Sequence, residues 1–195
     1  MTLKYEITGI QHSHREGLYR ICALRGYFKI QCQSRDLGGY IESEWNLSQE
    51  GDCWIGGDAT VHGSGQVYNN AWVFENAKIY GNARVYENAK IYGNAWVTGH
   101  SQIFGNAKVG NYAEVCDHVR VYGNARLYGA WVGGAIKISE SMEISGASYI
   151  DSECQIYYAD GVTAFFDENK ELIVNGTSSD TDIEYHKTLA RLKLS

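Results

Sequence analysis

The chain has 195 residues, a formal net charge of −6, 22 glycines, 15 tyrosines and no proline. This length is sufficient for one domain with a sizeable core and small caps. Residues 54–132 carry six Lys/Arg against five Asp/Glu, whereas residues 133–195 carry five against eleven. The near-neutral middle of the chain disfavours a nucleic-acid-binding stripe, which needs clustered positive charge, and also an acidic rod that mimics DNA.

Five cysteines (Cys22, Cys32, Cys53, Cys116 and Cys154) include no CxxC pair. The sequence also shows no signal peptide and no long apolar stretch. We therefore expect reduced thiols in a cytoplasmic protein that does not bind a membrane, with no metal site and no cofactor.

Residues 1–53 alternate strand-like runs with Gly and charged turns, as in Leu18–Leu24 and Tyr27–Cys32. These residues predict a small β cap over the open end of the following repeat, because that end would otherwise expose unpaired backbone and apolar core.

Residues 54–162 contain a six-residue repeat of aliphatic side chains. The first thirteen are Ile55, Val61, Val67, Val73, Ile79, Val85, Ile91, Val97, Ile103, Val109, Val115, Val121 and Leu127. After one missing residue near Gly129, the series resumes at Val132, Ile138, Ile144, Ile150, Ile156 and Val162. The position four after each aliphatic residue is usually Ala, Gly or Ser. This period predicts a parallel β-helix in which the aliphatic and the small residue both point inward.

If three six-residue sides form one turn, residues 18 apart stack at the strand spacing of about 4.8 Å. The repeat then forms about six turns, a prism roughly 30 Å long. Gly-Asn pairs such as Gly81-Asn82 suit corners that need positive φ. Four asparagines 18 apart, Asn70, Asn88, Asn106 and Asn124, predict a stacked corner ladder in which Asn tolerates the left-handed conformation.

Residues 163–195 predict a hairpin, with strands at 164–166 and 171–174 around a turn at 167–170, followed by a short helix. Thr181 and Glu184 have the spacing of a capping box at the start of that helix. This tail is predicted to form a second cap.

The repeat unit Val-Tyr-Gly-Asn-Ala-Arg at 121–126 resembles the hexapeptide pattern of left-handed β-helix proteins. The entry segment at 38–55 resembles the GGW(V/I)-x-x-x-x-NLS-x-x-G-x-CW segment of YdcK-type proteins, and 18–25 resembles their LYRI-x-ALR run. This family is common in enterobacteria and their phages and is often labelled as acyltransferases. The resemblance covers roughly residues 17–130 and implies the left-handed fold more strongly than an activity.

One outward stripe combines stacked aromatics with flanking polar side chains. Tyr68, Tyr86, Phe104 and Tyr122 are 18 apart, interleaved with Gln66, Arg84, Gln102 and Arg120. This composition is typical of protein interfaces, although an aromatic ladder can also serve only to stabilise its own sheet. We therefore interpret Tyr68, Arg84, Tyr86, Phe104, Arg120 and Tyr122 as candidate partner-binding residues. A second outward column, Trp54 and Trp72 continued by Lys90, Lys108 and Arg126, is expected to pack near the N-terminal cap.

His100 and His118 are 18 apart at one corner, where they either fill the corner as Asn does or act as a general base. His62 is expected at a different point on its side, which leaves a metal without a third ligand. In the related acyltransferases a loop protrudes from the coil and supplies a catalytic His, whereas Ile55 to Leu127 has no insertion.

The sequence thus favours a non-catalytic β-helix scaffold that binds a protein partner or a second copy of itself, with a homotrimer suggested by the resemblance. A phage-type accessory or host-defence-modulating inhibitor role is also implied by the resemblance alone. The alternative is an acyltransferase that uses an acyl-CoA, with His100 or His118 as base at a subunit boundary. Nucleic-acid binding is the least favoured class.

Overall fold

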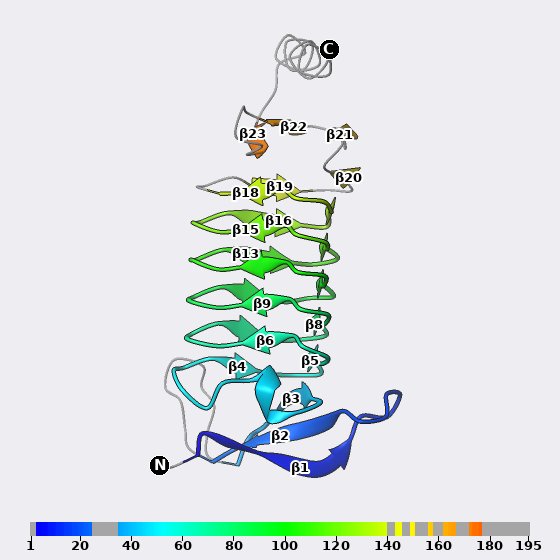
Figure 1. The fold of residues 1–195 in the computed structure, drawn as a ribbon, viewed down its shortest axis with the longest axis vertical. Coiled ribbons are helices and arrows are strands. Elements are labelled where there is room, and N and C mark those ends of the chain that lie inside the picture. The colour runs from blue at the N-terminus through cyan, green and yellow to red at the C-terminus, as the bar shows by residue number, and fades with distance from the viewer. Residues whose placement is uncertain are drawn as a thin grey trace.

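The computed structural model describes residues 3–24, 35–139, 143–145, 149–150, 156–157, 162–166 and 172–176. The described part is built from short β-strands and one 3-10 turn, η2 (Glu44–Asn46). The strands form a three-sided coil of stacked turns, with antiparallel strands beneath the first turn (Figure 1). The predicted all-β parallel β-helix of about six turns is confirmed. The described residues contain no helix that is long and apolar enough to cross a membrane.

Each of the first five turns of the coil contributes one strand to each of three sides, and the described part of the sixth turn contributes a strand to sides 1 and 2. Side 1 contains β4 (Trp54–Ile55), β7 (Trp72–Val73), β10 (Lys90–Ile91), β13 (Lys108–Gly110), β16 (Arg126–Tyr128) and β19 (Glu143–Ser145). Side 2 contains β5 (Thr60–Val61), β8 (Lys78–Ile79), β11 (Trp96–Val97), β14 (Glu114–Val115), β17 (Trp131–Val132) and β20 (Tyr149–Ile150). Side 3 contains β6 (Gln66–Val67), β9 (Arg84–Val85), β12 (Gln102–Ile103), β15 (Arg120–Val121) and β18 (Lys137–Ile138).

The register is the predicted 18-residue stacking. Ile91 lies between Val73 and Val109, for example, and the missing residue near Gly129 shortens one step, so that Glu114 pairs with Trp131. All the coil's aliphatic positions from Ile55 to Ile150 are at most 2% exposed, as are the small residues four positions later from Ala59 to Ala125, with Ser101 among them. The interior of the prism is therefore one continuous apolar column, as the repeat predicts.

The corners correct one part of the prediction. Positive φ occurs at the first corner residue, usually Gly, and the asparagines and histidines at the second corner position do not adopt it. Where the first residue is acidic, as at Glu75, Glu87 and Asp117, its carboxylate accepts the N–H of the corner residue in the next turn at 2.7–2.8 Å. Those bonds offset the cost of a left-handed non-glycine residue. The predicted ladder is present in the bonds Asn70 to Asn88 and Asn106 to Asn124.

The C-terminal end of the repeat also differs from the prediction. Ile156 lies in β21 (Ile156–Tyr157), which pairs antiparallel with β20, and Val162 begins β22 (Val162–Phe166). Ile156 pairs directly with Ile150, so β21 extends the sheet of side 2 in the antiparallel direction instead of forming part of another parallel turn. The predicted hairpin is confirmed by the antiparallel pairing of β22 with β23 (Leu172–Gly176). The predicted helix lies outside the described residues.

The N-terminal strands continue the sheet of side 2. β1 (Tyr5–Gln11) and β2 (Tyr19–Ala23) are antiparallel, and β3 (Leu37–Ile41) pairs with β2 and, in parallel, with β5. Gly38 and Gly39 permit this close approach, because a Cβ on Gly39 would lie 2.5 Å from the carbonyl oxygen of Ala59. The predicted strand at Leu18–Leu24 is thus confirmed as β2, whereas Tyr27–Cys32 lies outside the described residues.

A buried lysine fastens the first residues to the start of the coil. The Lys4 side chain is fully buried, and its Nζ donates to the carbonyl oxygen of Cys53 at 2.9 Å and to Cys53 Sγ at 3.0 Å. The hydroxyl of Tyr5 donates to the carbonyl oxygen of Leu47 at 2.6 Å. These contacts satisfy polar groups that would otherwise be costly to bury, and they cover the open end of the apolar column.

Candidate functional site

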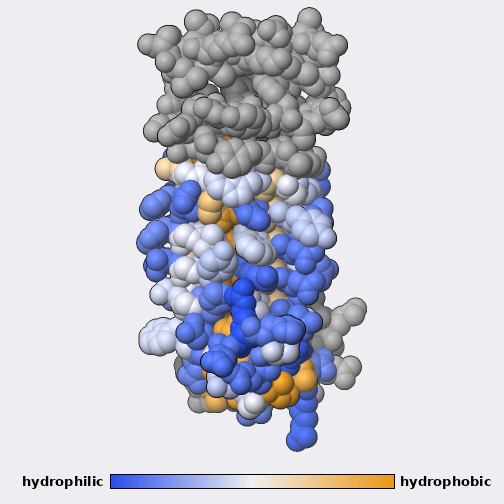
Figure 2. All heavy atoms as spheres, turned by 90° about the vertical axis from the view of Figure 1, so that its right-hand side faces the viewer, coloured by the Kyte–Doolittle hydropathy of each residue, from blue (hydrophilic) through white to orange (hydrophobic). Residues whose placement is uncertain are grey.

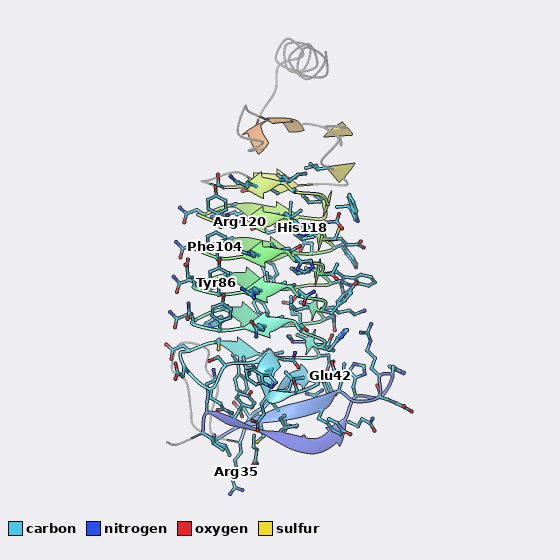
Figure 3. All side chains as sticks on the ribbon, viewed as in Figure 1. Arg35, Glu42, Tyr86, Phe104, His118 and Arg120 are labelled. Atoms are coloured by element: carbon cyan, nitrogen blue, oxygen red, sulfur yellow. The ribbon has the colours of Figure 1, made fainter. Side chains whose placement is uncertain are left out.

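Four aromatic rings on side 3 form one continuous stack, which we call the aromatic strip. Its members are Tyr68, Tyr86, Phe104 and Tyr122, with centroid separations of 4.9, 4.9 and 5.0 Å and interplanar angles of 2–5°. Figure 3 shows Tyr86 below Phe104 along one edge of the coil. All four side chains are half-buried. The predicted stacking on one side is therefore confirmed.

The two middle rings have no free face, because each lies between two neighbours at van der Waals spacing. The register places Ser48 at the level below Tyr68 and Ser139 at the level above Tyr122, so serines bound the strip at both ends. The strip thus presents ring edges and three phenol hydroxyls outward. A flat ligand has no place to stack between the middle rings.

A polar column runs beside the strip on the same side. Its members pair in register as Gln66, Arg84, Gln102 and Arg120. Arg84 and Arg120 are exposed, and the guanidinium of Arg120 lies 5.3 Å from the ring centroid of Phe104 and 5.9 Å from that of Tyr122. The Tyr86 hydroxyl lies 3.4 Å from Gln102 Oε1. Side 3 therefore combines aromatic edges, amides and guanidinium groups on one rigid surface.

Burial raises the pKa of the Tyr68 hydroxyl, and the neighbouring Tyr86 raises it further. Burial also raises the pKa of Tyr86, although the charge of Arg120 opposes part of that rise. Both phenols therefore stay protonated at neutral pH and remain hydrogen-bond donors.

His100 and His118 stack on each other with centroids 5.0 Å apart. Both are exposed at the corner that joins side 2 to side 3, and Figure 3 shows His118 well separated from Phe104. His62 belongs to another column, where it stacks on Tyr80 at 5.2 Å. The three histidines therefore do not converge, as predicted. Among the described residues, no group of three or more His, Cys, Asp or Glu side chains could hold a metal ion.

A pocket of about 350 Å³ lies near the base of side 2, where the loop between β1 and β2 meets the coil. Arg15, Glu16, Leu18, Glu42 and His62 line it, and Arg15 Nη1 lies 2.9 Å from His62 Nε2. Burial lowers the pKa of His62, and the charge of Arg15 lowers it further. Neither His100 nor His118 lines this pocket, so it does not supply the site that the acyltransferase alternative requires.

A comparison with known families bears on the coil. A family model described as the YdcK beta solenoid repeat matches residues 77–90, which span the strands β8 and β9, the two corners that follow them and the first residue of β10. Residues 77–90 of the coil carry the YdcK-type repeat. The predicted resemblance is thereby confirmed at the level of the repeat and of the solenoid fold. No curated protein matches the chain.

Side 1 of the coil carries the predicted second column, in the register Trp54, Trp72, Lys90, Lys108 and Arg126. Trp54 is buried and lies close to Gly38 of β3, in agreement with packing against the N-terminal strands. The ammonium of Lys90 lies 4.7 Å from the Trp72 ring centroid. Beyond Trp72 the column is entirely cationic up to Glu143, which forms an exposed 3.5 Å ion pair with Arg126.

Side 2 of the coil presents aromatic residues that sequence reasoning missed. Tyr80, Trp96 and Trp131 lie on this side, and the ammonium of Lys78 is 4.6 Å from the Trp96 ring centroid. In Figure 2, which faces side 2, side chains of intermediate hydropathy occupy the middle of the coil and hydrophilic ones lie along its margins. The 18-residue spacing could have revealed only part of this set, because the missing residue shifts Trp131 out of step with Trp96 and Glu114.

Cys116 on side 2 is predicted to react slowly with alkylating reagents. Burial raises the pKa of its thiol to about 12, and Asp117, whose carboxylate lies 3.7 Å from Sγ, adds to this rise. The thiolate is the reactive form, so its labelling by iodoacetamide at pH 8 should be at least about a hundredfold slower in the folded protein than in urea. Peptide mass spectrometry of timed samples measures this rate, and equal rates in both states would contradict the assignment.

Proposed function

We propose that this protein is a non-catalytic scaffold that binds a protein partner through side 3 of its coil. The binding surface comprises Tyr68, Arg84, Tyr86, Phe104, Arg120 and Tyr122. The observation that carries the proposal is the unbroken four-ring stack, half-buried and flanked by two exposed arginines. Aromatic and Arg side chains are the types enriched at protein interfaces and at their energetic centres.

The rigidity of the strip supports binding of a macromolecule. Each ring is fixed by its neighbours, and each strand beneath it bonds to the turns above and below, as in the bond from Tyr86 N–H to the Ile103 carbonyl. A partner that contacts the strip therefore orders few side chains, which lowers the entropic cost of association. The strip offers a ladder of ring edges and hydroxyls over four turns of the coil, a surface that suits a protein better than a small molecule.

The cellular location and biological role that we propose rest on the family resemblance. We propose a cytoplasmic protein that acts as a phage-type accessory or host-defence-modulating inhibitor, either alone or as a homotrimer. The alternative is an acyltransferase that uses an acyl-CoA, with the exposed His100–His118 pair as the candidate base. That pair lies on another corner, away from the aromatic strip, so the two functions can be tested separately.

The proposal predicts that Tyr86→Ser with Phe104→Ser abolishes partner binding without unfolding the coil. The two substitutions remove the middle of the strip, and binding of a partner identified by affinity capture should weaken at least tenfold, because interface aromatics are frequent hot spots. Calorimetry with the purified partner measures the affinity, and light scattering measures the oligomeric mass.

The matched control is Tyr80→Ser, which removes a half-buried aromatic at the same repeat position on side 2. This variant should bind as the unmodified protein does. If the double variant keeps both the oligomeric mass and partner binding, the strip is only a stabilising ladder and the proposal is wrong. A thermal shift with acetyl-CoA that His100→Ala and His118→Ala abolish would instead support the acyltransferase.

A further inference from the structure

The charges of the coil are segregated by side, although its net charge is close to zero. Within residues 54–132, five of the six cations lie on outward positions of sides 1 and 3: Arg84, Lys90, Lys108, Arg120 and Arg126. We call this set the basic edge. Four of the five acids lie on side 2 or at its two corners: Asp58, Glu75, Glu114 and Asp117. The single cation of side 2 is Lys78.

The basic edge straddles the corner at which the aromatic strip ends. Lys90, Lys108 and Arg126 follow one another on consecutive turns of side 1, and Arg84 and Arg120 lie two turns apart on side 3. Within residues 54–132, Glu87 is the one acid at this corner, and its carboxylate accepts the N–H of Gly105 at 2.8 Å. Lys137 extends the cations of side 3 by one more turn. Asp52 lies near Asn70 at the entry end of the same corner.

We propose that the partner is an acidic protein segment that lies across this corner and contacts both the aromatic strip and the basic edge. The proposal rests on the proposed function and names the chemistry of its partner. Carboxylates of the partner would meet guanidinium and ammonium groups from two sides, together with phenol hydroxyls that act as donors. Such complementarity sets specificity and speeds association. The near-neutral net charge of residues 54–132, from which the sequence disfavoured nucleic-acid binding and an acidic rod that mimics DNA, conceals this segregation.

An acidic protein fits this surface better than a nucleic acid. Single-stranded nucleic acids bind by stacking bases on exposed aromatic faces, whereas both faces of Tyr86 and Phe104 are covered by neighbouring rings. Two of the cations also lie over rings, Lys90 over Trp72 and Arg120 over Phe104, which directs them along the surface. Ring edges and hydroxyls can still contact a polypeptide backbone and its carboxylates.

Charge reversal on matched positions tests this inference. Lys108→Glu on side 1 and Lys78→Glu on side 2 make the same change at the same repeat position. Both lysine side chains are half-buried. The probes are a fluorescent glutamate-rich peptide and an oligothymidylate of equal charge, titrated by anisotropy at several salt concentrations. We expect peptide binding that weakens with salt, a loss of at least about tenfold for Lys90→Glu with Lys108→Glu, and a change within about twofold for Lys78→Glu.

Several results would overturn the inference. One is an equal effect of Lys108→Glu and Lys78→Glu, and another is tighter binding of the oligothymidylate than of the peptide. A third is salt-sensitive self-association that Lys108→Glu abolishes, together with no binding of the peptide. That result would mean that a second copy of this chain, and not an acidic partner, binds at this corner. Thermal unfolding of each variant verifies that the coil is intact, and Lys108→Gln provides a milder change if the reversal unfolds it.

The same titrations separate this inference from the proposed function. If Tyr86→Ser with Phe104→Ser abolishes binding of the captured partner while the charge reversals do not, the strip binds a partner that is not acidic, and only the inference fails. If the charge reversals abolish peptide binding while the aromatic variant keeps its captured partner, the basic edge stands and the proposed role of the strip fails.

Discussion

Replacing Ile103 by Ala is expected to lower the free energy of unfolding by about 3–4 kcal/mol, within the range measured for large-to-small changes in cores. Ile103 is fully buried at the middle of the coil, between Val85 below and Val121 above. The backbone around it is held by the bonds from Tyr86 N–H to the Ile103 carbonyl and from Phe104 N–H to the Val121 carbonyl. The turns therefore cannot collapse into the space, and a cavity remains.

Urea unfolding followed by circular dichroism measures this loss, and Ile103→Val is the graded control. That change removes one methylene and should cost about 1 kcal/mol. Ser64→Ala, at an exposed corner, should have almost no effect. A cost below about 1 kcal/mol for Ile103→Ala would mean that the interior at this turn is not close-packed.

The interior of the coil could be predicted from the sequence because one physical rule governs it. Each side of a turn contains six residues, so the same repeat position points inward in every turn. The spacing alone therefore places Ile103 above Val85. The same spacing correctly predicted the aromatic strip and the separation of His62 from His100 and His118. These predictions needed only the period and the inward direction of the aliphatic residue.

The corners and the charges could not be predicted in the same way. Which corner residue takes positive φ depends on the backbone path, and we assigned it wrongly to the second position, where Asn70 and His118 stand. The segregation of charge depends on which sides of the coil carry the cations and which carry the acids. A net charge summed over residues 54–132 does not contain that information. Extending the period to Val162 was wrong for the parallel stack, because Ile156 pairs antiparallel with Ile150 and Val162 begins the hairpin of β22 and β23. The six-residue spacing does not encode this change of strand direction.

The structure explains one residue of the entry segment, Asn46, whose role the sequence motif alone does not give. Asn46 belongs to the run that resembles YdcK-type proteins, and its side chain is fully buried beneath the first turn. Its Oδ1 accepts the backbone N–H groups of Ser43 at 2.9 Å and Glu42 at 3.1 Å. Its Nδ2 donates to the carbonyl oxygens of Gly65 at 2.9 Å and Gly63 at 3.0 Å. One amide thus joins the segment before the coil to the corner above it.

Asn46→Ala is therefore expected to cost about 3 kcal/mol or more, because two N–H groups and two carbonyl groups lose their partner in a buried site. The control is Asn70→Ala, which removes an exposed amide that donates to Asn88 Oδ1 at 3.3 Å and should cost less than about 0.5 kcal/mol. Thermal and urea unfolding measure both, and limited proteolysis reports whether residues 42–53 detach first.

A second substitution at the same position distinguishes hydrogen bonding from simple loss of volume. Asn46→Asp keeps the shape and both acceptor bonds but sets a carboxylate against the carbonyl oxygens of Gly63 and Gly65. Burial and those oxygens would raise the folded-state pKa of the carboxyl above its unfolded value. The variant should then be least stable at neutral pH and regain stability as the pH falls through that raised pKa, because the protonated carboxyl can donate again. If Asn46→Asp is as stable as the unmodified protein at pH 7, the amide donors do not hold the entry segment, and the packing of Leu47 and Tyr5 alone must close the coil.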